Sequence, residues 1–257
     1  MIQLINIQKT FNEGSETAIC AINNISLNIE LNTWCNLIGP NGSGKSTLMR
    51  IIAGEYFPTS GEILVDDEDI SNWDQRQRTK FFYFGEQDTT ANLVPSMTIA
   101  ENLLLSLEMN RFPSLKFLKT KDNMDKIYET LTYVQMGLED RLSTQVRFLS
   151  GGQRQAVVLA KALLTNAKIL LLDEFLGAID PKTGPFLLDI IKDMAKKRQL
   201  TVIMISHELE HVLQAKGRVV VLSQGKIYAD LSEEKTLFSK ESLIKLYQSA
   251  IEESGKI

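Results

Sequence analysis

One nine-residue stretch, GPNGSGKST, constrains the fold of this chain more than any other feature of its sequence. It spans residues 39–47, where the apolar segment WCNLIG meets the helix-like segment TLMRIIAG. The stretch fits the pattern G-x-x-x-x-G-K-[ST], in which glycines let the backbone close around phosphate groups at a helix N-terminus. A glycine-rich turn with an exposed lysine is the alternative, but a strand before and a helix after are the context that a phosphate loop requires. We therefore predict an α/β core that binds the phosphates of a nucleotide.

The side chains of this loop, which we call the first cradle, have separate predicted roles. Lys45 reaches the β- and γ-phosphates, Ser46 ligates Mg²⁺ through its hydroxyl, and Thr47 donates a hydrogen bond to phosphate. The predicted nucleotide contacts of the first cradle are Gly39, Pro40, Asn41, Gly42, Ser43, Gly44, Lys45, Ser46 and Thr47.

Apolar runs elsewhere in the chain predict the rest of the core. MIQLINI, ISLNIE and EILVDD alternate polar and apolar residues, as half-buried strands do. KILLLDE, TVIMISH and RVVVLSQG are continuously apolar, which is typical of parallel strands covered on both faces by helices. We predict one α/β domain over residues 1–257: a mixed sheet flanked by helices, from residues 1–91 and 168–257, and an inserted α-helical subdomain at 92–167.

A carboxylate pair follows the apolar strand KILLLDE. Asp173 is predicted to hold the magnesium ion, directly or through water. Glu174 is predicted to polarise the attacking water as a general base. Such a pair is also an ordinary strand end, but together with the first cradle the catalytic interpretation is favoured.

Two further side chains end apolar strands. His207 closes TVIMISH at the edge where open α/β sheets bind ligands, and a neutral imidazole there can donate to the third phosphate. A helix-start residue satisfied by the backbone is the alternative, and we favour it for His211. Gln87 closes FFYFGEQ, and its neutral amide can contact both magnesium and water and couple nucleotide state to rotation of the helical subdomain.

The stretch LSGGQRQ resembles a second phosphate site. Ser150 is predicted to cap the helix QAVVLAKALLT, while Gly151 and Gly152 bring backbone N–H groups close to an anion. This second cradle, residues 150–153, lacks a lysine and a metal-binding hydroxyl, so it would clamp a nucleotide held elsewhere. If it cannot reach its own first cradle, the partner is another copy or a related chain, joined head to tail. An ordinary capped helix start is the alternative.

Taken in order, GPNGSGKST, Gln87, LSGGQ, ILLLDE, Asp180 and His207 resemble the ATP-binding cassette (ABC) ATPases, and LSGGQ is that family's signature. The resemblance covers nearly the whole chain. It implies ATP and Mg²⁺ as ligands, and a dimer in which one subunit's second cradle faces the ATP of the other. The second-cradle residues so implied are Ser150, Gly151, Gly152 and Gln153.

The resemblance also implies roles for two residues that the sequence alone leaves ordinary. Phe11 would stack on adenine, although a ring after a first strand is more often a core residue. Asp180 would belong to the dimer-interface loop, although ahead of Pro181 it can be a turn residue. The chain departs from the family at Phe175, where many members have proline, and in LGAID, which replaces the commoner TSALD. Because Glu174 and Asp180 are retained, we expect hydrolysis to survive.

GLEDRL and DEFLGAIDPKTG look like the ATPase subunits of bacterial importers that work with a lipoprotein or periplasmic binding protein, some linked to aromatic amino acids. The leading hypothesis is an ATPase subunit that powers solute import through a separate membrane permease. It would act as a dimer of two copies, with a solute-binding protein in the same system. A soluble ABC-type ATPase acting on nucleic acid or ribosomes is the alternative.

Composition bears on this choice. The chain has 28 Lys and Arg against 32 Asp and Glu, a net charge of -4, which counts against nucleic acid as a partner. No apolar run approaches the roughly 20 residues that span a bilayer, and the first residues resemble a strand more than a signal peptide. Cys20 and Cys35 lie in apolar contexts that predict buried free thiols. We expect a peripheral protein on the cytoplasmic face of the inner or plasma membrane.

Overall fold

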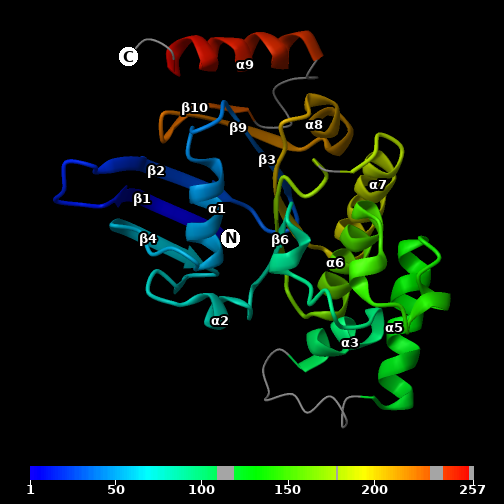
Figure 1. The fold of residues 1–257 in the computed structure, drawn as a ribbon. Coiled ribbons are helices and arrows are strands. Elements are labelled where there is room, and N and C mark those ends of the chain that lie inside the picture. The colour runs from blue at the N-terminus through cyan, green and yellow to red at the C-terminus, as the bar shows by residue number, and fades with distance from the viewer. Residues whose placement is uncertain (109–118, 178, 232–239, 255–257) are drawn as a thin grey trace.

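The structure of the chain is a computed structural model that describes residues 1–108, 119–177, 179–231 and 240–254 (Figure 1). Its strands are β1 (Ile2–Phe11), β2 (Ile19–Ile29), β3 (Trp34–Ile38), β4 (Ser60–Val65), β5 (Glu68–Asp69), β6 (Phe82–Glu86), β7 (Ile169–Asp173), β8 (Thr201–Ile205), β9 (Arg218–Ser223) and β10 (Lys226–Leu231). Its α-helices are α1 (Lys45–Ala53), α2 (Gln75–Arg78), α3 (Ile99–Leu104), α5 (Lys121–Val134), α6 (Gly151–Leu164), α7 (Thr183–Arg198), α8 (Leu209–Ala215) and α9 (Lys240–Ser254). The 3-10 turns are η1 (Thr89–Ala91), η2 (Leu105–Glu108), η3 (Glu139–Arg141) and η4 (Val146–Phe148). Residues 109–118 of the predicted helical segment, and Ala178 of LGAID, lie outside the described residues.

The strands form two sheets. The larger sheet has six strands in the order β10-β9-β3-β8-β7-β6, and the smaller has four, in the order β2-β1-β4-β5. In the larger sheet, β10 pairs antiparallel with β9 and the other pairings are parallel. The continuously apolar strands β7 and β8 are buried at every position, because helices cover both faces of this sheet. The predicted mixed sheet flanked by helices is confirmed.

The two faces of the larger sheet pack against different helices. Along β7, Leu170 and Leu172 belong to the cluster that contains α6 and α7. The alternate residues Ile169 and Leu171 belong to the cluster that contains α1 and the smaller sheet. Since successive side chains of a strand point to opposite faces, α1 and α6 lie on opposite faces of the larger sheet (Figure 1).

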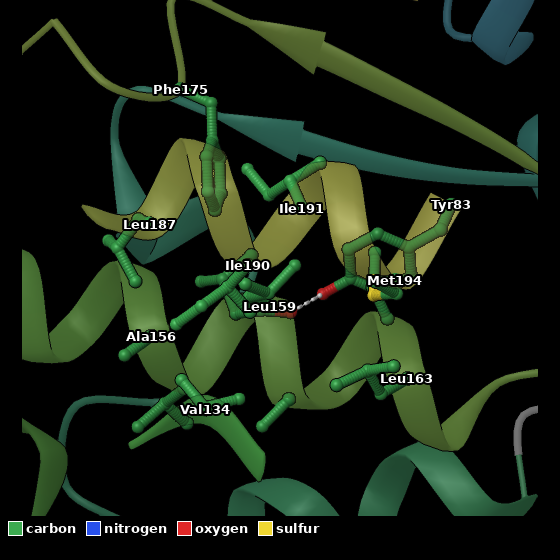
Figure 2. Close-up of a cluster of buried hydrophobic side chains, with 14 of the residues drawn as sticks. Tyr83, Val134, Ala156, Leu159, Leu163, Phe175, Leu187, Ile190, Ile191 and Met194 are labelled. Carbon is green, nitrogen blue, oxygen red and sulfur yellow. Dashed lines mark hydrogen bonds between the residues drawn. The ribbon is translucent and has the colours of Figure 1, made fainter. Parts of the chain in front are cut away.

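A large apolar cluster joins α6 and α7 to the sheet (Figure 2). Phe175, which replaces a commoner proline, is 1 % exposed and lies in this cluster. The hydroxyl of Tyr83, on β6, donates to the carbonyl oxygen of Val158 on α6 at 3.0 Å. Phe175 therefore holds the start of the LGAID loop, residues 176–180, in the core.

A fully buried arginine closes the C-terminal end of α1. The guanidinium of Arg78 donates to the carbonyl oxygens of Ile51 and Ile52 in the last turn of α1. It also donates to three carbonyls between residues 70 and 73. Burial lowers the pKa of Arg78 to about 10. Helix ends leave carbonyls without partners, so this side chain completes the helix that carries the first cradle.

The cysteine prediction is half wrong. Cys35 on β3 is buried, but Cys20 is exposed. Cys20 pairs with Thr10 at the far end of the β1–β2 hairpin, where residues 12–20 all face solvent. Its apolar sequence context therefore does not correspond to burial. Among the described residues, no helix combines the length and apolar character needed to cross a membrane.

Candidate functional site

The first cradle lies where β3 ends and α1 begins. Gly44 is the N-cap residue of α1, with φ 98°, a left-handed conformation that favours glycine. A Cβ atom there would lie 2.6 Å from the carbonyl oxygen of Ala21, so no other residue fits without movement. No side chain caps α1, which leaves its first backbone N–H groups available to an anion.

The side chain of Lys45 folds back over the loop of residues 39–44. Its side chain is 5 % exposed, and Nζ donates to the carbonyl oxygens of Gly39 at 2.9 Å and Pro40 at 3.0 Å. Burial lowers the pKa of Lys45, and the charges of Glu174 and Asp173 oppose that shift. The ammonium group is thus held inside the loop that is predicted to wrap the phosphates.

Ser46 and Asp173 come together across the core. Oγ of Ser46 donates to Oδ1 of Asp173 at 3.2 Å, and Asp173 is 7 % exposed. Burial raises the pKa of Asp173, while the bond from Ser46 lowers it. Among the described residues there is no group of three or more His, Cys, Asp and Glu that could hold a metal. A hydroxyl beside one carboxylate nevertheless fits Mg²⁺, which usually takes one or two protein oxygens and completes its shell with phosphates and water.

Glu174 and His207 form a close pair at the ends of neighbouring strands. Nε2 of His207 lies 2.6 Å from Oε1 of Glu174, and both side chains are about one-third exposed, at 34 % and 30 %. Parallel pairing of β7 with β8 brings the two strand ends to one edge of the sheet. Glu174 has φ 49°, a left-handed conformation that is strained for a residue with a side chain. The backbone therefore turns sharply just where the predicted base stands.

Gln87 lies beside this pair, directly after Glu86, which is the register partner of Asp173. A cavity of about 110 Å³ is lined by Gln87, Glu174 and His207, among others. A Cβ atom at Gly177 would lie 3.4 Å from Nε2 of Gln87, so glycine in LGAID leaves the amide room. Among the residues that the structure describes, no hydrogen bond joins the Gln87 side chain to Ser46 or Asp173. The structure brings Gln87 to one cavity with Glu174 and His207, and the predicted contact of Gln87 with magnesium stays a prediction.

His211 has structural contacts. It is 6 % exposed, and Nε2 lies 3.5 Å from Oε2 of Glu208. A Cβ atom at Gly184 on α7 would lie 3.4 Å from that same nitrogen. The side chain therefore packs toward α7, and its polar contact is the Glu208 carboxylate, not the backbone that the sequence analysis expected; His211 also lines the cavity beside Glu174 and His207.

The second cradle is a well-formed helix start. The hydroxyl of Ser150 accepts from the backbone N–H of Gln153, and the side chain of Gln153 accepts from the N–H of Ser150, each at 3.2 Å. This reciprocal capping box holds the first turn of α6 rigidly. A Cβ atom at Gly152 would lie 2.8 Å from Cγ2 of Thr183, so glycine permits the close approach of α6 to α7.

The two cradles of one chain are separated by the larger sheet. The first cradle starts α1, and the second starts α6 on the opposite face. No hydrogen bond or ion pair within the described ranges joins residues 150–153 to residues 39–47. This arrangement favours the interpretation that the second cradle serves another nucleotide site.

Phe11 and Asp180 make local contacts of their own. The Phe11 ring meets the Tyr56 ring edge-on, with centroids 5.4 Å apart, and it is only partly buried. Oδ1 of Asp180 accepts from the backbone N–H groups of Lys182 at 3.1 Å and Thr183 at 3.0 Å, and bonding to Thr183 lowers the pKa of Asp180. Asp180 therefore stabilises the turn that leads into α7.

Two polar residues near the site, the buried Gln155 and the partly exposed Arg50, were not predicted from the sequence. Gln155 on α6 binds the backbone at Gln87. Arg50 on α1 forms an ion pair with Glu86 at 3.0 Å, directly before Gln87. Gln155 had a signal, because it is a polar residue directly before the apolar run AVVLA.

With this geometry in hand, comparison with known proteins defines the class. A model of the ABC transporter family matches residues 22–177. The chain belongs to that family, and it is an ATP-binding, ATP-hydrolysing subunit of the ABC type.

Its relatives narrow the comparison. The tyrosine transport ATP-binding protein of Clostridioides difficile (strain R20291) is 33% identical over 253 residues, which cover 98% of this chain and 100% of that protein. The methionine import ATP-binding protein MetN of Escherichia coli (strain K12) is 36% identical over 229 residues, 88% of this chain and 64% of MetN. The chain therefore spans slightly less than two-thirds of that relative's length.

Solved structures share the fold. The dimeric, post-hydrolysis ATP-binding cassette MJ0796 bound to ADP and Pi superposes with a TM-score of 0.80 at 29% identity, covering 91% of this chain and 99% of the other. The ADP conformation of the cassette MJ1267 superposes with a TM-score of 0.79 at 26% identity, covering 96% and 98%.

Proposed function

We propose that two copies of this chain power the import of a small organic solute, such as an amino acid, through a separate membrane permease. ATP would close the two copies on each other and hydrolysis would release them. The observation that carries the proposal is the Glu174–His207 pair at 2.6 Å, at the same strand end as the Ser46–Asp173 pair. Glu174 and His207 would handle the proton of the attacking water, and Ser46 and Asp173 would hold the metal ion at the phosphates. Phosphoryl transfer to water needs both functions close together.

Each side chain has a proposed task. Lys45 leaves the carbonyls of the first cradle and contacts the β- and γ-phosphates. Glu174 orients the attacking water and takes its proton, and His207 holds Glu174 in place and contacts the third phosphate. Gln87, from the same cavity, contacts that water.

Ser46 and Asp173 are the proposed protein contacts to Mg²⁺, and Gln87 is proposed as a third. When bound, the ion would offset the negative charge of the phosphates. The adenine is proposed to lie on the Phe11 ring, which is partly open to solvent.

The second cradle is proposed to face the nucleotide of the other copy. Its capped N-terminus presents backbone N–H groups, and the sheet separates it from its own first cradle. A head-to-tail pair of copies would then hold two equivalent composite sites, with Asp180 near the interface. Residues 92–167 are proposed to form the inserted helical subdomain that moves in this closure and docks on the permease near Gln87.

The substrate class is proposed from the relatives, which are named for tyrosine transport and methionine import. A solute-binding protein would deliver the substrate on the other side of the membrane. The chain itself would lie on the cytoplasmic face as a peripheral subunit.

Substitution of the proposed base tests the hydrolytic site. Glu174→Gln should lower the ATP hydrolysis rate by at least about 100-fold while ATP binding persists, because the amide cannot take a proton. In gel filtration with ATP, this variant should elute as a dimer, and Glu129→Gln, an exposed change on α5, should behave as the parent chain. Normal hydrolysis by Glu174→Gln would remove Glu174 from the mechanism.

Isolation from native membranes tests the partner. The tagged chain, solubilised in detergent, should carry a polytopic membrane protein with it. Recovery of ribosomes or nucleic acid without a membrane protein would instead support a soluble ATPase.

A further inference from the structure

Gln155 connects α6 to the residue that precedes the helical segment. Its side chain is 2 % exposed, and Nε2 donates to the carbonyl oxygens of Glu86 at 3.2 Å and Gln87 at 3.1 Å. The amide therefore uses both of its N–H groups on two successive backbone carbonyls. Among the described residues, its Oε1 atom is buried with no partner.

The backbone that Gln155 holds is a closed loop, residues 86–92, which we call the Gln87 loop. Oδ1 of Asn92 accepts from the N–H of Glu86 at 3.2 Å, and Nδ2 of Asn92 donates to the carbonyl oxygen of Phe84 at 2.7 Å. At its far end, Nζ of Lys161 donates to the carbonyl oxygen of Asn92. Helix α6 therefore holds the Gln87 loop at both ends, through Gln155 and Lys161.

The same helix begins at the second cradle. Gln155 lies five residues after the N-cap Ser150, about 7.5 Å along the axis. The capping box and the contact of Gly152 with Thr183 make this first stretch rigid. A movement of the Gln87 loop relative to α6 must therefore break the Gln155 bonds or displace the second cradle.

We infer that Gln155 is the positioning residue that couples Gln87 to the second cradle of the same chain. The inference rests on the proposed function, in which Gln87 responds to the nucleotide at the first cradle. Gln155 touches no reacting atom in this scheme. It makes the cradle offered to the other copy depend on the state of the chain's own nucleotide site.

The unpartnered Oε1 supports a role in positioning over one in packing. A buried acceptor without a donor reduces stability, so an apolar side chain of similar size would suit packing better at this place. The two donated bonds are the contribution that an apolar residue cannot make.

Two substitutions separate the donors from the shape. Gln155→Leu removes both donors and the unpartnered acceptor and keeps the approximate size. Gln155→Glu keeps the shape but sets a carboxylate against two carbonyls, and protonation of the introduced group at lower pH restores one donor. Gln248→Glu, an exposed change on α9, is the matched control.

Steady-state hydrolysis is the first measurement. Both variants at position 155 should lower kcat about tenfold or more and leave the KM for ATP within about twofold, because the first cradle is untouched. The kcat of Gln155→Glu relative to the parent chain should recover as pH falls from about 8 to 6, and that of Gln155→Leu should not. If Gln155→Glu fails to fold, Gln155→Leu carries the test.

Hydrogen exchange without nucleotide is the second measurement. Backbone amides of residues 86–92 should exchange about tenfold faster in Gln155→Leu than in the parent chain. In Gln248→Glu their exchange rates should equal those of the parent chain. Parent-like kcat and parent-like exchange in Gln155→Leu would overturn the inference, and so would a loss of kcat matched by an equal rise in KM. If the parent chain does not hydrolyse ATP, the proposed function is wrong. The exchange data would still test whether Gln155 positions the Gln87 loop.

Discussion

Ser46 and Asp173 are 127 positions apart in the chain, and Oγ of Ser46 donates to Oδ1 of Asp173 at 3.2 Å. The contact joins the first turn of α1 to the end of β7, which are neighbours only because β7 lies inside the larger sheet. The carboxylate is buried in spite of its charge. Burial of a carboxylate beside a hydroxyl is a cost to folding that a bound cation offsets.

Asp173→Asn should therefore separate stability from activity. Burial raises the pKa of Asp173, so the native state binds a proton more readily than the unfolded chain, and stability is lost as pH rises through the raised pKa. The neutral amide removes that loss, so the variant should have a higher Tm than the parent chain at neutral pH. Its ATP hydrolysis should fall about 100-fold or more. Thermal unfolding without nucleotide checks the effect on stability. An ATPase assay with Mg²⁺-ATP checks the effect on activity.

Asp125→Asn, an exposed change on α5, is the control for Asp173→Asn. A lower Tm for Asp173→Asn at neutral pH would show that the charge stabilises the fold, contrary to this prediction.

Arg78→Met should destabilise the whole core. The substitution leaves five buried carbonyls without their donor, including those of Ile51 and Ile52 at the end of α1. We expect a loss of about 3 kcal/mol in the free energy of unfolding, measured in urea. Arg76→Met, an exposed change on the same short helix, should cost less than about 0.5 kcal/mol. Equal effects at the two positions would contradict the structural role of Arg78.

Gly152→Ala should loosen the contact between α6 and α7. The new methyl group would lie 2.8 Å from Cγ2 of Thr183, so one of the helices must move. We expect the free energy of unfolding, measured by thermal unfolding, to fall by about 1–3 kcal/mol. Thr183→Ser removes Cγ2 and keeps the backbone N–H that Asp180 binds, so the double variant should regain most of the loss. If Thr183→Ser does not rescue Gly152→Ala, the helices do not meet at these atoms.

Lys161 should make stability depend on alkaline pH. Burial lowers its pKa from 10.5 to about 8, so between these values the unfolded chain binds a proton that the native state has released. Stability due to this group therefore rises with pH across that window, by at most about 3 kcal/mol, and does not change below it. The stability of the parent chain relative to Lys161→Met, measured in urea at pH 7 to 10, should show this rise.

Lys168→Met, at an exposed lysine, should show no such pH-dependent difference from the parent chain. If the stability difference between the parent chain and Lys161→Met does not change from pH 7 to 10, the prediction is wrong and the ammonium group is solvated.

Much of the site could be predicted from neighbouring residues. The first cradle, the capping serine of α6 and the polar residues that end β6, β7 and β8 are local patterns, because a cap or a strand end depends on residues only a few positions away. The alternation of the outer strands and the apolar character of β7 and β8 predicted a mixed sheet covered by helices for the same reason, whereas the division of the strands into two sheets came only from the structure.

Other features depend on which strands are neighbours. Glu174 meets His207 because β7 pairs with β8, and Ser46 meets Asp173 because α1 packs over β7. Gln155 and Arg78 find their backbone partners only after the helices have packed. Cys20 is exposed because the β1–β2 hairpin projects beyond the core, which its apolar neighbours do not reveal.

The sequence by itself determined the phosphate loop, the order of strands and helices, and the residue types at the strand ends, since these are set by spacing and capping along the chain. The tertiary structure alone decided which of those residues meet, and on which face of the sheet each cradle lies. Contacts across more than a hundred residues depend on strand order and layer packing, and local periodicity carries no record of either.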